Sequence, residues 1–315
     1  MLKKIDSIID KHLGDSCLIL GSGPTLDDFD FGNFKGKILL AGNTILRIDK
    51  EKIKPDYLIT SNNHFPVVNI QSHLNFINSF EKLTWILSDT GCHNDIWKFD
   101  EKLYNNLKPN HIFFDDRHFG GIECNPRKEC CNFLKKYPNR YTLLEVVEKK
   151  FNSNFNFKKK NGCSIADATF MVATLMGFEH IFIQGVDLPL MFYKGKQKNI
   201  KYYGYQNLNA DKFEDETNKI IKKKYFFYYL KKMDFKPYLQ SFFKQIYNYF
   251  FNKDYSLFQE NFDTSINIFQ WLTEINIKLN RKVFYLSKES NLKKVKNLTY
   301  KQSQKLNLDF QELFN

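Results

Sequence analysis

Residues 16–26 have the sequence SCLILGSGPTL, in which a short apolar run leads directly into a loop with two glycines. This order predicts a buried strand followed by a tight turn. Because glycine has no Cβ, Gly21 and Gly23 would let a phosphate or ribose approach the backbone N–H groups. Pro24 and Leu26 do not fit the dinucleotide pattern G-x-G-x-x-G. The stretch therefore predicts the first strand of an α/β sheet with a nucleotide loop after it, and a plain tight turn is the alternative.

The composition favours a globular protein with acidic partners. The chain has 315 residues, of which 43% are hydrophobic, enough for one large or two modest domains. A formal net charge of +12 favours nucleotides, anionic glycolipids or an anionic membrane surface. The basic residues are dispersed and form no nucleic-acid motif, so no nucleic-acid partner is expected. Neither a signal peptide nor a membrane span is evident, which predicts a cytoplasmic protein, at most peripheral to the inner membrane.

The six cysteines show no regular pairing. Cys124, Cys130 and Cys131 with His118 form one loose group, whereas zinc sites commonly use two well-spaced ligand pairs. We therefore expect no metal site, no disulfide framework and a reducing compartment.

Short apolar runs recur at residues 38–41, 57–60, 83–87, 111–114 and 181–184. Their lack of strict alternation predicts strands covered on both faces, as in a parallel sheet. Small and apolar residues from Cys163 to Met176 predict a helix that ends at Gly177. With the strand at 181–184 and Gly185-Val186-Asp187 after it, this unit predicts half of a doubly wound fold.

The predicted organisation has three parts. Residues 1–186 form a Rossmann-like nucleotide-binding domain, and residues 187–254 form an inserted lid rich in Tyr, Phe and Lys. Two amphipathic helices expected at 217–253 would lie on an anionic bilayer or pack on the main domain. Residues 255–315 return to the sheet with a helix near 266–272 and a strand at 282–286, and the tail from Glu289 onward is predicted to be peripheral.

Polar and small residues follow several predicted strands and should meet at one edge of the sheet, where open α/β sheets bind ligands. Amides and hydroxyls at these places suit a ribose, a pyrimidine edge and a phosphate, and the helix start after Ser164 adds its dipole. Each could also be an ordinary turn residue. The candidate nucleotide-binding residues are Gly21, Ser22, Gly23, Pro24, Thr25, Asn43, Asn62, Asn63, Gly162, Cys163, Ser164 and Asp187.

These motifs, with the segments GCSIA at 162–166 and MGFEHIFIQGVD at 176–187, resemble bacterial lipooligosaccharide sialyltransferases of glycosyltransferase family 42. The resemblance covers residues 16–64 and 162–200, and residues 255–286 more loosely. It implies a single Rossmann-like sheet, a GT-A-like variant with a helical lid. It also implies inverting, metal-independent transfer of a sialic-acid-like or other ulosonic sugar from a CMP donor to a cell-surface glycan or glycolipid, with no cofactor.

The family carries a histidine base shortly before its late helix, but the last histidine of this chain is His180. Aligning Asp263 with the family's helix start places Glu260 near the expected base, where apolar neighbours would raise its pKa. His64 is the alternative base. Tyr193 corresponds best to the family's lid tyrosine, which would donate to the leaving phosphate.

The same landmarks also resemble the 6-hydroxymethylpterin pyrophosphokinase-like family, which includes flagellin-modifying motility accessory factors. Residues 53–61 and 162–166 carry this second resemblance. That family ends its third strand in an aspartate that would hold Mg²⁺, whereas this chain has Asn62. Asn62 favours the CMP-sugar interpretation over an ATP- and Mg²⁺-dependent pyrophosphokinase. The missing late histidine leaves a non-catalytic nucleotide- or glycan-binding module as a second alternative. The sequence leaves a homo-oligomer open.

Overall fold

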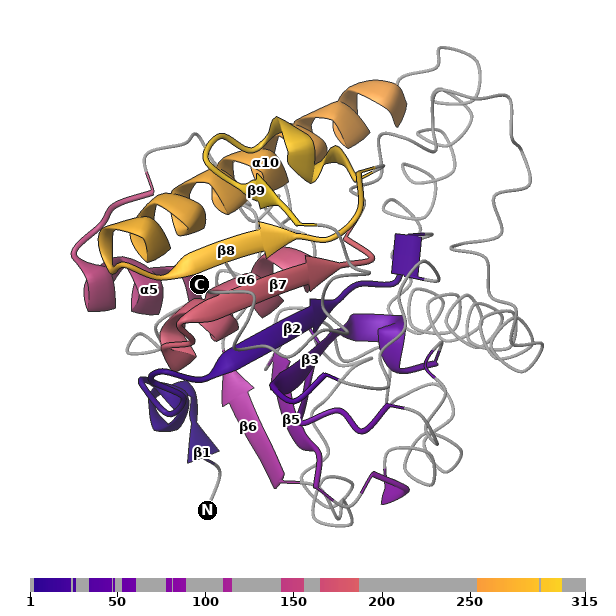
Figure 1. Cartoon of the computed structure of the whole chain (residues 1–315), viewed down its shortest axis with the longest axis vertical. Coiled ribbons are helices and arrows are strands. Elements are labelled where there is room, and N and C mark those ends of the chain that lie inside the picture. The colour runs from indigo at the N-terminus through magenta and orange to yellow at the C-terminus, as the bar shows by residue number, and fades with distance from the viewer. Residues whose placement is uncertain are drawn as a thin grey trace, which may run out of the picture.

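The computed structural model describes residues 3–23, 25–26, 34–46, 48, 53–60, 78–80, 82–88, 110–114, 143–155, 165–186, 254–288 and 290–301. Their strands join into one sheet in which every neighbouring pair is parallel, in the order β1-β6-β5-β4-β3-β2-β7-β8-β9 (Figure 1). The strands are β1 (Lys3–Lys4), β2 (Ser16–Leu20), β3 (Lys37–Ala41), β4 (Tyr57–Thr60), β5 (Thr84–Ser88), β6 (Asn110–Phe114), β7 (His180–Gln184), β8 (Lys282–Tyr285) and β9 (Thr299–Tyr300). The helices are α5 (Leu143–Phe151), α6 (Ile165–Met176) and α10 (Asp254–Lys278), with the 3-10 turns η1 (Ile5–Ile8), η3 (Gly42–Leu46) and η6 (Asn291–Lys294).

The predicted parallel α/β sheet is confirmed, because each predicted apolar run is a strand within one residue of its expected bounds. In β2 and β7 every residue after the first is buried. The two strands lie side by side in register, from Ser16 opposite His180 to Leu20 opposite Gln184. Continuous apolar runs suit such central strands because helices and loops cover both faces of a parallel sheet.

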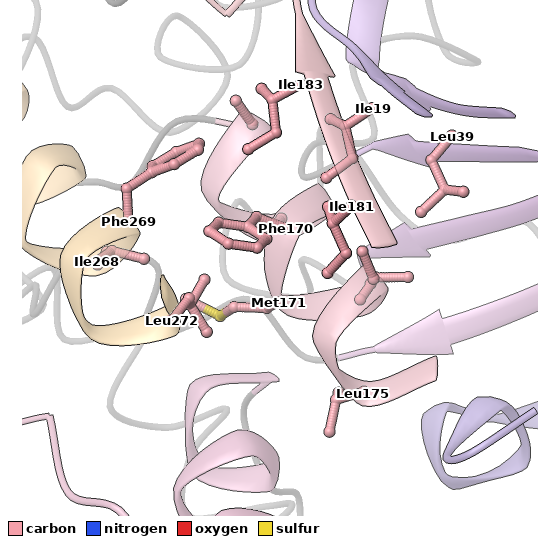
Figure 2. Close-up of a cluster of buried hydrophobic side chains, with 14 of the residues drawn as sticks. Ile19, Leu39, Phe170, Met171, Leu175, Ile181, Ile183, Ile268, Phe269 and Leu272 are labelled. Carbon is pink, nitrogen blue, oxygen red and sulfur yellow. The ribbon is translucent and has the colours of Figure 1, made fainter. Parts of the chain in front are cut away.

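Helix α6 is the centre of the core on one face of the sheet. Every residue from Ala166 to Met176 is buried, because α6 packs on β2, β3 and β4 and is covered in turn by α5 and α10. Figure 2 shows Phe170 and Met171 of α6 between the β-strands and the α10 side chains Phe269 and Leu272. The Phe170 and Phe269 rings lie 5.1 Å apart between centroids. A helix with apolar residues around most of its circumference is typical of this fully enclosed position.

Helix α10 is longer than the predicted helix near 266–272 and contains it. It ends at Lys278, and β8 begins only four residues later at Lys282. Asn280 makes this sharp return possible with a φ of +58°, a left-handed conformation that asparagine tolerates. Because α10 runs antiparallel to β8, the amino-terminal half of α10 lies toward the carboxyl ends of the strands (Figure 1).

The tail after Glu289 is not peripheral as far as Lys301, contrary to the prediction. Leu292, Val295 and Leu298 are buried in the main hydrophobic core, and β9 extends the sheet beside β8. The Ser290 hydroxyl caps η6 by accepting from the Leu292 N–H and donates to the Val186 carbonyl at 2.7 Å. These apolar residues recur at every third position among lysines and asparagines. The segment is therefore polar on average, although its apolar side chains share one buried side.

The predicted lid at 187–254, with its two amphipathic helices, lies outside the described residues except for Asp254, where α10 begins. Within the ranges described above, no helix has both the length and the apolar character needed to cross a membrane.

Candidate functional site

The direction of the chain through the sheet reverses between β2 and β7. From β2 the chain moves outward through β3, β4, β5 and β6, whereas from β7 it moves the opposite way to β8 and β9. Such a reversal is a topological switch point, and open α/β sheets bind ligands outside the carboxyl ends of the strands there. The Gly21-containing loop follows β2 and the Gly185-containing loop follows β7, so both lie at this point.

These two loops touch through their glycines. A Cβ on Gly21 would lie 2.3 Å from the carbonyl oxygen of Gly185, and a Cβ on Gly185 would lie 2.3 Å from that of Gly21. Gly185 also has a φ of +67°, which L side chains rarely adopt. The structure therefore gives a packing reason for both glycines: the backbones approach too closely for any side chain.

Backbone hydrogen bonds hold the β2 loop against β7. The Gly21 N–H donates to the Gln184 carbonyl at 2.8 Å, and the Gly23 N–H donates to the Gly185 carbonyl at 2.7 Å. Both N–H groups are thus engaged within the protein rather than presented to a phosphate. The nucleotide role of the loop stays a prediction, and in this conformation its contacts would come from other groups of the loop, among them the half-buried Ser22.

The Gln184 side chain makes a third link between the two loops. Its Nε2 donates to the Thr25 carbonyl, and both residues are buried. The Leu26 N–H closes the turn on the Gly23 carbonyl at 3.0 Å. The loop from Gly21 to Leu26 is therefore fixed to β7 by side-chain as well as main-chain contacts, and sequence reasoning did not anticipate the role of Gln184.

The loop after β3 lies against the start of α6. Gly42 has a φ of +58°, and a Cβ there would lie 3.1 Å from the Cγ2 atom of Ile165, the first residue of α6. The Thr44 hydroxyl donates to the Ala41 carbonyl at 2.7 Å and closes this turn. The backbone of Asn43 belongs to η3, while its side chain is outside the described part. The structure thus brings the start of α6 to the carboxyl end of β3.

A buried carboxylate near the start of α6 escaped the sequence analysis. Asp167, in the first turn of α6, is fully buried and accepts a hydrogen bond from the Ser265 hydroxyl of α10 at 2.8 Å. Buried acidic side chains are rare unless they are paired or hydrogen-bonded. The signal was available as an aspartate inside the apolar run IADATF. This contact ties the start of α6 to the part of α10 that follows Glu260.

Apart from the backbone of Glu260, the remaining predicted site residues lie outside the described residues. Glu260 belongs to the amino-terminal half of α10, but its side chain is not described. The structure therefore places the β2 loop, the Asn43 backbone and the α6 start along one edge. It does not test the other predicted contacts, which involve Pro24, Asn62, Asn63, His64, Gly162, Cys163, Ser164, Asp187 and Tyr193.

Several ionisable groups with shifted pKa values are the first residues of strands, at the opposite edge of the sheet. Burial raises the pKa of Tyr57 to about 12, and burial lowers the pKa of His180. A hydrogen bond to Asp56 raises the pKa of Lys37. Tyr57 contacts the His12 Nε2 atom at 2.7 Å, and the His12 Nδ1 atom lies 2.9 Å from Asp15. These groups lie at or near the amino ends of the strands, at the opposite end of the sheet from the switch point.

Among the residues that the structure describes, no group of three or more His, Cys, Asp or Glu side chains is arranged to hold a metal ion. Cys17 is a buried free thiol whose pKa burial raises well above its usual value. Such a thiol is an inert core residue.

No protein-family model matches the chain, and no curated protein matches it in sequence. Among solved structures, the chain is similar to the sialyltransferase CstII from Campylobacter jejuni in complex with the substrate analogue CMP-3FNeuAc. The identity is 13%, the TM-score is 0.43, and the match covers 90% of this chain and 86% of that chain. It is also similar to the α-2,3-sialyltransferase Cst-I from Campylobacter jejuni, at 14% identity and a TM-score of 0.42, covering 91% of this chain and 80% of that one.

A third similarity is to the MAf glycosyltransferase from Magnetospirillum magneticum AMB-1. Its identity is 18% and its TM-score 0.32, and the match covers 57% of this chain and 24% of that one. The fold assignment itself rests on the strand order and register described above.

Proposed function

We propose that the protein is an inverting, metal-independent glycosyltransferase that uses a CMP-activated sialic-acid-like or other ulosonic sugar. The observation that carries the proposal is the switch point between β2 and β7, with the glycine-containing loop of the family-like motif locked at its edge. A rigid loop at this place would bind a nucleotide with little ordering cost. The motif resemblance of residues 16–64 and 162–200 supports CMP as that nucleotide.

In the proposed reaction, an acceptor hydroxyl attacks the anomeric carbon of the donor sugar. The bond between that carbon and the phosphate oxygen breaks, and CMP leaves with the bonding electrons. The acceptor proton passes to Glu260 or His64, the two candidate bases. A hydrogen bond from Tyr193 would stabilise the charge that develops on the phosphate. CMP is a good leaving group, so the step needs no divalent ion.

Glu260 lies within α10 rather than before a helix start at Asp263, because α10 begins at Asp254. Its role as the base stays a proposal, compatible with this half of α10 lying toward the carboxyl ends of the strands (Figure 1). The acceptor in this proposal is a cell-surface glycan or a glycolipid of the kind found in lipooligosaccharide. The net charge of +12 would favour peripheral binding to an anionic cytoplasmic leaflet, where a lipid-linked acceptor is available.

Thermal unfolding in the presence of nucleotides tests the proposal. A ligand that binds only the folded state at about 100 times its Kd stabilises that state by roughly 2.7 kcal/mol. We expect CMP to raise Tm without Mg²⁺, and ATP with Mg²⁺ to leave Tm unchanged. The reverse pattern would support the pyrophosphokinase interpretation and refute the transferase.

A second assay separates a transferase from a binding module. Incubation with a CMP-sugar and no acceptor should release CMP slowly through hydrolysis, and Glu260→Gln and His64→Asn variants should show which residue acts as the base. Nucleotide binding without any hydrolysis or transfer across a panel of donors and acceptors would favour the non-catalytic module.

A further inference from the structure

Gln184, the last residue of β7, is a polar side chain in apolar surroundings. Side chains alternate along a strand, so it shares a face of β7 with Phe182, whose ring stacks on Phe284 at 5.4 Å. Gln184 is 2% exposed. Its Oε1 atom has no hydrogen-bond partner among the residues that the structure describes. An apolar side chain at this position would avoid the cost of burying an oxygen without a hydrogen bond. The role of Gln184 must therefore lie in the other polar atom of its amide, Nε2.

The Nε2 atom donates to the Thr25 carbonyl across the switch point. The main-chain bonds from β7 reach Gly21 and Gly23, at the near side of the loop. The Nε2 contact reaches past them to Thr25, at the far side of the turn.

We propose that Gln184 is a positioning residue that holds the far side of the Gly21–Leu26 loop in the conformation that binds the nucleotide. The inference rests on the proposed function for its ligand, CMP, and on the structure alone for the loop. Gln184 does not touch the reacting atoms, and it acts through the Thr25 carbonyl.

The chain offers a matched control in Asn276 of α10, which is also a buried amide. Its Nδ2 donates to the Thr174 hydroxyl at 3.0 Å and to the Leu272 carbonyl at 2.8 Å. Its Oδ1, like the Oε1 of Gln184, lacks a hydrogen-bond partner within the described part of the chain. Its partners lie toward the carboxyl ends of α6 and α10, which lead into the starts of β7 and β8. Asn276 therefore makes no contact with the loop.

The experiment compares Gln184→Met with Asn276→Leu, each an apolar replacement of similar size, in the full-length protein. Hydrogen exchange of peptides covering residues 16–26 reports the order of the loop, and calorimetric titration reports CMP affinity. We expect Gln184→Met to accelerate exchange in these peptides and to weaken CMP binding by about tenfold, the loss of roughly one hydrogen bond. Asn276→Leu should change neither.

A third variant, Gln184→Glu, gives a pH signature that a purely structural role would not produce. Its carboxylate cannot donate to the Thr25 carbonyl, but the protonated carboxyl can, and burial raises the pKa of a carboxyl group. The CMP affinity of this variant, divided by that of the wild-type protein at the same pH, should therefore rise as the pH falls.

Unchanged exchange in the Gln184→Met protein would overturn the positioning role whatever the ligand. Faster exchange with unchanged CMP affinity would overturn the link to binding. Failure of the wild-type protein to bind CMP would instead refute the proposed function and the claim that Gln184 supports CMP binding. The exchange result would still decide whether Gln184 orders the Gly21–Leu26 loop. If Gln184→Met unfolds, the pH ratio of Gln184→Glu decides.

Discussion

Replacement of Gly185 by alanine should be among the most damaging single-methyl additions in this protein. The new Cβ would lie 2.3 Å from the Gly21 carbonyl oxygen, a separation that forces the β2 and β7 loops apart. A φ of +67° at this position adds about 1–2 kcal/mol for a residue with a Cβ. Overpacking against rigid backbone costs typically 1–3 kcal/mol, and the separation weakens the hydrogen bond from Gly23 to Gly185. We expect the free energy of unfolding to fall by roughly 2–5 kcal/mol.

Two other glycines separate the conformational cost from the steric cost. Gly14 has a φ of +82° with nothing within 4 Å of its added Cβ, so Gly14→Ala should cost only about 1–2 kcal/mol. Gly42 has a φ of +58° and a contact of 3.1 Å with the Cγ2 atom of Ile165, which is longer than the 2.3 Å approach at Gly185 and involves a side chain instead of backbone, so Gly42→Ala should fall between the two. Urea unfolding followed by circular dichroism measures the series. Equal losses for Gly185→Ala and Gly14→Ala would refute the close approach of the two loops.

Two further perturbations test the core and the amino edge. Ser265→Ala removes the hydroxyl that donates to the buried Asp167 carboxylate and should cost about 1.5–3 kcal/mol. Thr273→Val, which removes a hydroxyl bonded within its own helix, should cost clearly less in the same urea assay, and equal losses would contradict the bridge between α6 and α10. Burial raises the pKa of Tyr57 to about 12, so the unfolded chain loses this proton more readily and stability should decline as pH rises from about 10 through about 12. Unfolding of the wild-type protein and Tyr57→Phe across this range should show a shallower decline in the variant, and parallel curves would exclude Tyr57 as a source.

The core strands were readable from local pattern. An apolar run of four or five residues between turn signals is consistent with a buried strand and too short for a typical buried helix, and seven such runs are strands of the sheet. The tail was misjudged because Leu292, Val295 and Leu298 are scattered among lysines. Their burial depends on β8 lying beside them, which is a contact between segments rather than a property of either segment.

The sequence predicts at which end of the sheet the candidate site would lie, but not the contacts within it. The rule that parallel strands end at one edge is enough to place the β2 loop and the β3 loop at the same end of the sheet. Glycine in a loop has several possible reasons, including ligand approach, a turn and close backbone packing. The Gly21 N–H and Gly23 N–H groups donate hydrogen bonds to Gln184 and Gly185. Only the positions of both loops in the structure show that close backbone packing accounts for these glycines.

The amino-acid sequence alone was sufficient for the class of fold, the order of its strands along the chain and the glycine-containing loop after the first central strand. These features depend on residue type and local spacing, which a single segment carries by itself. The tertiary structure was needed to establish that Gly21 meets Gly185, that Gln184 reaches Thr25 and that Ser265 reaches Asp167. Each of these contacts joins residues about 100 or more positions apart, and such pairs are set by how the strands are ordered in the sheet, because no local pattern encodes which distant segment becomes the neighbour.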